Sequence, residues 1–153
     1  MKLTEELVNQ LKALLEANMK DKIAELNAEY QDDLLQTPAA YYISEKDLDN
    51  VAQFPAIFIL ADSHDWRDEK QGIAKHKVIV DIGVMEQEEE KLQKKLMRFL
   101  RACIEIINAD RQLATTAMET DFDRAEYTPM LVGADKTFLK DVFLELTIWT
   151  EEV

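Results

Sequence analysis

The chain has 153 residues, of which 47% are hydrophobic and 32% are Asp, Glu, Lys or Arg. This length and composition predict one globular domain with a sizeable core, which we expect to span residues 1–153. Asp and Glu number 31 against 18 Lys and Arg, so the formal net charge is −13, which disfavours tight non-specific binding to nucleic acid.

A long amphipathic helix is predicted over about residues 3–33. Apolar side chains recur there every three or four residues, which is the period of a helix with one buried face. They are Leu3, Leu7, Leu11, Leu14, Leu15, Met19, Ile23, Leu26 and Tyr30. Thr4 is a suitable N-cap, and Pro38 disfavours helical geometry at the residue before it, so the helix is expected to end before Pro38.

The middle of the chain predicts two strands. Residues 44–47 are typical of a helix-capping sequence, and we expect one or two helical turns reaching Ala52. The short apolar run 56–60 then favours a strand covered on both faces. The polar residues 62–72 are predicted to be a connection, and residues 75–85 alternate as a second strand.

A second helix is predicted from about Gln87 to Asn108, and two further strands follow it. Residues 114–127 alternate between acidic and less polar side chains, which predicts a strand with an exposed acidic face. Residues 138–150 alternate strictly, with Val142 to Ile148 on one face. The order α-β-β-α-β-β predicts an α+β domain of two layers, in which a mostly antiparallel (mixed) sheet of about four strands packs against two main helices. The body formed by the sheet and the second helix is expected over about residues 54–150.

The single cysteine, Cys103, lies in the apolar stripe of the second helix, which indicates a buried and unreactive thiol. A lone cysteine allows no disulfide within the chain and suits a reducing compartment. The N-terminus lacks the segments of a signal peptide, and no apolar run approaches the roughly 18 residues of a membrane span. We therefore expect a soluble intracellular protein without membrane contact.

Catalytic motifs are scarce. Asp62, Ser63, His64 and Asp65 include every residue type of a serine-hydrolase triad, but neighbouring side chains diverge and no Gly-x-Ser-x-Gly turn is present. The same segment could bind a cation, together with Asp68 and Glu69 farther along, although no recognised ligand spacing occurs. A polar turn is the favoured interpretation. We predict no catalytic residue, no metal site, no cofactor and no enzymatic activity.

Two kinds of surface are better supported than catalysis. Glu119, Asp121 and Asp123 would project from one strand face at intervals of ~7 Å, where they could hold a metal, although a solvated face is favoured. The apolar tripeptide Met130-Leu131-Val132 lies in a predicted loop between Pro129 and Gly133. Apolar groups in such places often mark protein contacts, so we predict a partner or subunit contact there.

The same prediction covers Phe143 and Trp149, which share the more polar face of the last strand. Large aromatic side chains on such a face are candidates for contacts between subunits. The alternative is that the first helix or a loop of the same subunit covers them.

The order of these elements resembles the tail-terminator or tail-completion (head–tail joining) proteins of tailed bacteriophages. The likeness covers about two-thirds of the chain, from Phe54 onward, and concerns the pattern of elements more than individual identities. It is carried by residues 54–59, 76–84, 92–107, 126–129 and 142–148.

The resemblance implies a structural protein of the virion neck or tail end, made in the cytoplasm of the bacterial host. In this family the protein forms a homo-oligomeric ring, commonly a hexamer, that caps the tail tube and joins it to the head connector. Its expected partners are therefore itself, the tail tube protein and the connector proteins. A ring of this kind lets DNA pass without binding it tightly, and Glu119, Asp121 and Asp123 are candidates for its lumen.

Two alternatives remain. The chain could be a small acidic adaptor that uses its long helix against a partner helix. It could also be a metal-dependent hydrolase built around Asp62, His64 and Asp65, which is the less favoured of the two.

Overall fold

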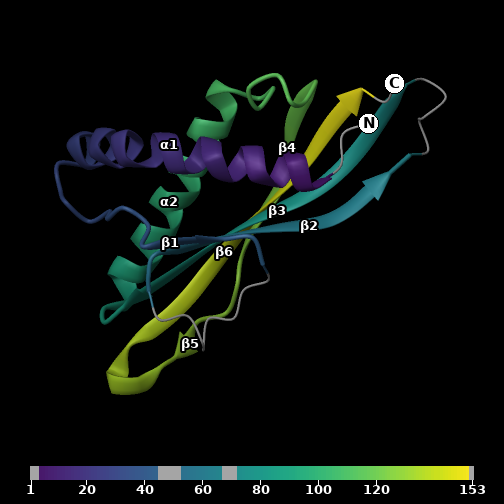
Figure 1. Ribbon diagram of the computed structural model, residues 1–153. Helices are drawn as coiled ribbons and strands as arrows, with labels where there is room; N and C mark the ends of the chain where they lie inside the picture. The colour runs from purple at the N-terminus through teal and green to yellow at the C-terminus, as the bar shows by residue number, and fades with distance from the viewer. Residues whose placement is uncertain (1–3, 45–52, 67–71, 152–153) are drawn as a thin grey trace.

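Two helices lie on one face of a mixed sheet in the computed structural model, which describes residues 4–44, 53–66 and 72–151 (Figure 1). The α+β class with two layers is therefore confirmed. The elements in chain order are α1 (Thr4–Tyr30), β1 (Ala40–Tyr42), β2 (Ala56–Asp65), β3 (Ile73–Glu86), α2 (Glu89–Ala109), β4 (Glu119–Tyr127), β5 (Leu131–Val132), the short 3-10 helix η2 (Ala134–Lys136) and β6 (Phe138–Glu151).

The sheet has the strand order β1-β2-β3-β6-β4, and β5 pairs with β6 beside β4. Its centre is the antiparallel pair of β3 and β6, 14 residues each, which runs from Ile73 opposite Glu151 to Glu86 opposite Phe138. Only β1 runs parallel to its neighbour among the described strands. The short strands β1 and β5 were not predicted, and they raise the described sheet from about four strands to six.

The core lies between the helices and one face of the sheet. The strands contribute side chains at alternate positions, as a half-buried sheet requires. The stripe of α2 packs on them around Phe99, which is fully buried. The two helices are also joined at the end of α1, where Arg98 bonds Asp32 at 2.8 Å and lies 3.9 Å over the ring of Tyr30.

Helix α1 follows its prediction closely and ends at Tyr30, because Gln31 has a positive φ of 57°. Its apolar stripe is buried against the rest of the chain. The buried residues are Leu7, Val8, Leu11, Leu15, Met19, Ile23 and Leu26. None of the helices in the described part of the chain combines the length and hydrophobicity needed to cross a membrane.

Strand β2 continues through Asp65, so the prediction of a connection beginning at residue 62 was wrong for its first four residues. Pairing with β3 explains the difference, because His64 lies opposite His76 and Asp65 opposite Lys75 after a register shift between Ala61 and Ser63. The predicted short helix at residues 45–52 and the candidate ligands Asp68 and Glu69 lie outside the described residues.

The predicted strand over residues 114–127 begins five residues later, at Glu119. Residues 110–117 are a series of turns instead, in which Leu113, Ala114 and Thr115 all have positive φ. Leu113 is fully buried in this segment and joins the core. The turns place Arg111 beside the start of β4.

Candidate functional site

The sheet face opposite the helices, called the outer face below, brings two predicted sets of residues together. Strand β6 contributes Phe143 and Trp149 to this face, since both alternate with residues of the core. The register of β4 places Glu119 opposite Trp149 and Asp121 opposite Thr147. The candidate lumen carboxylates and the candidate contact aromatics are therefore neighbours on one surface.

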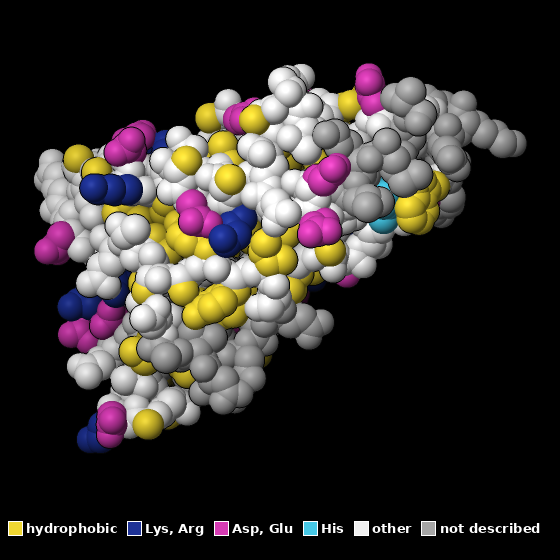
Figure 2. All heavy atoms as spheres, in the orientation of Figure 1, with side chains coloured by type: hydrophobic (Ala, Val, Ile, Leu, Met, Phe, Trp, Pro, Cys, Tyr) yellow, Lys and Arg dark blue, Asp and Glu magenta, His cyan; other side chains and the backbone are white. Residues whose placement is uncertain are grey.

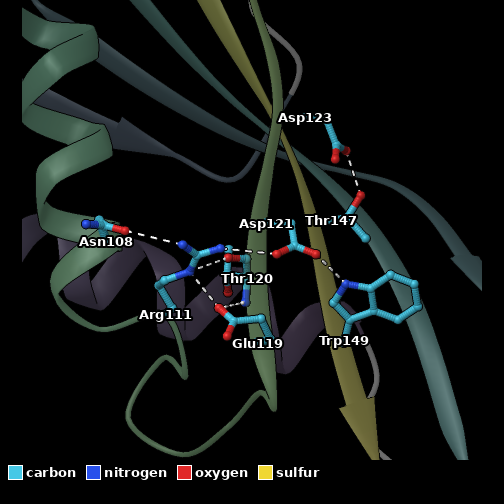
Figure 3. A network of polar contacts seen from close by, with 8 residues as sticks. All are labelled: Asn108, Arg111, Glu119, Thr120, Asp121, Asp123, Thr147 and Trp149. Carbon is cyan, nitrogen blue, oxygen red and sulfur yellow. Dashed lines mark hydrogen bonds and ion pairs between the residues drawn. The ribbon is translucent and has the colours of Figure 1, made fainter.

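Arg111 binds the first two of these carboxylates (Figure 3). Its Nε donates to Glu119 Oε1 at 2.6 Å and to the backbone carbonyl of Thr120 at 2.9 Å. One terminal nitrogen donates to Asp121 Oδ1 at 3.1 Å, and the other reaches Asn108 Oδ1 at 3.4 Å. The guanidinium thus joins the end of α2 to the beginning of β4.

The second oxygen of Asp121 accepts a hydrogen bond from Trp149 Nε1 at 2.7 Å, which fixes the orientation of the indole (Figure 3). Asp123 accepts from the Thr147 hydroxyl at 2.6 Å and lies 3.4 Å from Lys77 Nζ. Three carboxylates thus face two cations, so the cluster keeps a charge of only −1. The acidic face is largely neutralised by cations of the same chain.

Sequence reasoning missed the role of Arg111. The available signal was that Arg111 is the only basic residue between Asn108 and Asp123, so it is the nearest basic residue on the N-terminal side of these carboxylates. The prediction of a strand from residue 114 hid this relation, because a strand would have carried Arg111 away from β4. The positive-φ turns bring it back instead.

Phe143 is half-buried, and Arg124 accounts for part of its cover. The guanidinium lies 5.7 Å from the ring centroid and is held by Glu145 at 2.9 Å and Glu126 at 2.7 Å. Lys75 Nζ lies 5.7 Å from the centre of the Trp149 ring in a similar way. Both aromatics therefore have cationic neighbours within the chain and do not form an open apolar patch.

The tripeptide Met130-Leu131-Val132 lies at the base of a hairpin formed by β5 and β6, which projects away from the helices (Figure 1). Met130 packs against the core, but 44% of Leu131 and 73% of Val132 are exposed. In Figure 2 this hairpin forms the narrow lower end of the molecule. Of the predicted contact residues, Leu131 and Val132 are the ones that remain open.

The turn of this hairpin is well ordered by hydrogen bonds. The Gly133 amide donates to the Thr137 carbonyl at 2.8 Å, and the Thr137 hydroxyl donates to the Ala134 carbonyl at 2.6 Å. A Cβ atom on Gly133 would lie 2.9 Å from Thr137 Oγ1, so a larger residue would disturb the turn. The hairpin therefore presents its side chains in a defined geometry, which lowers the entropy cost of binding.

The residues once considered for hydrolysis lie in β2, where they do not form a relay. Ser63 is opposite Lys77 and His64 is opposite His76, so their side chains point to opposite faces of the sheet. Within the described ranges, no three His, Cys, Asp or Glu side chains are grouped so that they could hold a metal ion. Charged side chains of both signs are dispersed over the face that Figure 2 shows.

His76 is fully buried on the core face of β3. Its Nδ1 lies 3.0 Å from the Thr4 hydroxyl and its Nε2 lies 2.9 Å from the Thr150 hydroxyl. The ring of His64 is tilted against it, with centroids 3.9 Å apart, and stacks on Trp66 with centroids 3.9 Å apart. Burial, and then the neighbouring His64, lower the pKa of His76 to about 4, so the imidazole is neutral at physiological pH.

No model of a known protein family matches this chain, and a search of curated proteins finds no match either. The functional proposal therefore depends on the surfaces just described, since a fold class alone does not define a function.

Proposed function

We propose that the chain is a non-enzymatic structural protein of a tailed-bacteriophage virion, similar to tail-terminator or tail-completion proteins. It assembles into a homo-oligomeric ring, with six subunits as the family implies, at the junction of the tail tube and the head connector. The observation that carries this proposal is the projecting β5–β6 hairpin, whose Leu131 and Val132 are exposed while the apolar faces of both helices are buried.

An exposed apolar hairpin at one end of a subunit favours head-to-tail association, in which different surfaces of successive copies meet. Such an association closes into a ring when the rotation between neighbours divides a full turn. Covering exposed apolar side chains stabilises an assembly by about 25 cal/mol per Å² of apolar surface that is buried. Leu131 and Val132 are suited to this role because they adjoin a hydrogen-bonded turn.

The charge of the chain suits a ring through which DNA passes. The net charge of −13 repels phosphates at long range. If the outer face lines the hole, Glu119, Asp121 and Asp123 contribute little to that repulsion, because Arg111 and Lys77 compensate most of their charge. The lumen wall would then carry only a small negative charge, and it would not hold DNA.

The alternative of an adaptor that pairs through its long helix requires a free apolar stripe on α1. That stripe is buried within the subunit. An adaptor function would therefore have to use another surface, such as the same hairpin.

The proposal is tested by the molecular mass of the purified protein, alone and with tail tubes, over a range of concentrations, together with negative-stain microscopy. Closed rings are expected. The double variant Leu131→Asp, Val132→Asp should remain monomeric with an unchanged melting temperature. Met97→Asp is the matched control, because Met97 is equally exposed on α2, away from the hairpin. A wild-type protein that stays monomeric in both conditions would refute the proposal.

A further inference from the structure

We propose that the hairpin of each subunit docks into the groove between α1 and α2 of the next copy, an inference that rests on the proposed ring. The groove has a volume of about 470 Å³ and lies between the middle of α1 and the C-terminal end of α2. Leu14 and Ile106 supply its apolar part, and acidic side chains supply most of its rim. The acidic residues are Asp21, Glu25, Glu105 and Asp110.

The groove is suited to a cationic side chain. Its lining holds four carboxylates and one lysine, Lys22, and Arg101 just outside the lining pairs with Glu105 at 2.9 Å, so the net charge is about −2. Lys22 Nζ is 3.0 Å from Glu25 and 3.9 Å from Glu105, whereas Asp21 has no cationic partner among the described residues. The last turn of α2 also lacks a basic residue, so the negative end of the helix dipole adds to this field.

The hairpin has the complementary charge. Residues 129–140 contain one Asp and two Lys, a net charge of +1 in a chain whose total is −13. Lys136 lies at the turn, is exposed, and forms no ion pair with the described residues. Val132 beside it can cover the apolar part of the groove while the lysine reaches the acidic rim. Complementary charges of this kind fix the register of an interface.

The positions of the two surfaces favour a contact between copies. The hairpin is at the lower end of the molecule in Figure 1, and the groove is formed where α1 passes the upper end of α2. One subunit therefore cannot fill its own groove. Repetition of the contact joins the lower end of each copy to the upper end of the next, which is a heterologous interface.

The decisive experiment uses engineered cysteines, which is practical because the native Cys103 is buried and its pKa is raised to about 12. The double variant Val132→Cys, Asn18→Cys places one thiol on the hairpin and one in the groove. Mild oxidation should convert most of the protein into covalent multimers ending in a closed ring, seen on non-reducing gels. The control Val132→Cys, Ala13→Cys moves the second thiol to the exposed face of α1 outside the groove and should stay monomeric on the same gels.

A charge exchange provides the second measurement. Lys136→Glu should weaken ring assembly about tenfold, because it sets like charges against each other at the interface. Asp21→Lys alone should weaken it as well, and the two changes combined should restore most of the loss. A merely structural effect of either substitution would not be reversed by the other.

The outcomes separate this inference from the proposed function. If the wild-type protein forms rings but the groove cysteine pair does not cross-link above the control, the docking inference is wrong and the ring proposal stands. If the wild-type protein forms no ring alone or with tail tubes, the proposed function fails first. Absence of rescue in the charge exchange also counts against the groove.

Discussion

His76 should make the protein less stable in mild acid. In the unfolded chain its pKa is near 6.5, and in the folded protein burial lowers it to about 4. Between these two pH values the unfolded state binds more protons than the folded state. The free energy of unfolding therefore has its full value above pH 6.5 and falls as the pH decreases toward 4.

The size of the effect follows from the two pKa values. Proton binding by one imidazole with these values lowers the free energy of unfolding by about 2 kcal/mol between pH 7 and pH 5. The pKa values of Glu29 and Asp32 are lowered by hydrogen bonds from Arg101 and Arg98, so these carboxylates titrate mainly below this window. The contribution of the imidazole is isolated by comparison with a variant that lacks it.

The assay is urea denaturation at pH 7 and pH 5, followed by circular dichroism. It should be done in the Leu131→Asp, Val132→Asp background, so that assembly does not add to the measured stability. The variant His76→Gln removes the titrating group and should lose most of the pH dependence. The reasoning is refuted if the variant loses as much stability between pH 7 and pH 5 as the protein that retains His76. It is also refuted if NMR gives His76 a pKa near 6.5.

Four other outcomes are expected. Arg111→Ala should lower the free energy of unfolding by about 1–2 kcal/mol, because it removes two exposed ion pairs and one hydrogen bond to a carbonyl. The control Lys20→Ala should change this free energy little. Phe99→Ala should cost about 3–5 kcal/mol in chemical denaturation, since the ring is fully buried in the core. Cys103 should resist maleimide in the native protein and react once it is unfolded, as mass spectrometry would show; rapid native labelling would contradict its burial. Deleting residues 4–30 should leave an unfolded chain by circular dichroism, because it removes seven buried side chains at about 1.5–3 kcal/mol each, a total at least comparable to the stability of an ordinary domain.

The sequence predicted the long elements well, because each carries a periodic apolar pattern over many residues. Strand β6 and helix α2 are examples, since a period of two or of 3.6 sustained for this length has few competing explanations. The short strands β1 and β5 have three and two residues, which is too few for any period to be visible. The polar end of β2 was missed because pairing with β3, and not hydrophobicity, makes it a strand.

The candidate site was predicted in part. Alternation was enough to place Glu119 and Asp121 on one face of their strand. It was also enough to place Phe143 and Trp149 on one face of the last strand. It did not show that these two strand faces belong to the same face of the sheet. That relation depends on the register between β4 and β6, which single-strand patterns do not contain. The contact of Arg111 with both carboxylates depends on turns in which non-glycine residues have positive φ. Such residues rarely adopt positive φ, so local propensities do not predict these turns.

Strand β4 lies at the border of the described sheet, and its register shift between Phe122 and Arg124 interrupts the row of backbone groups that a border strand offers to other chains. A straight border would accept one foreign strand after another and grow into a fibre. The kink, which contains Asp123, interrupts that template. Open-ended strand pairing through this border is thereby disfavoured, even when many copies crowd together.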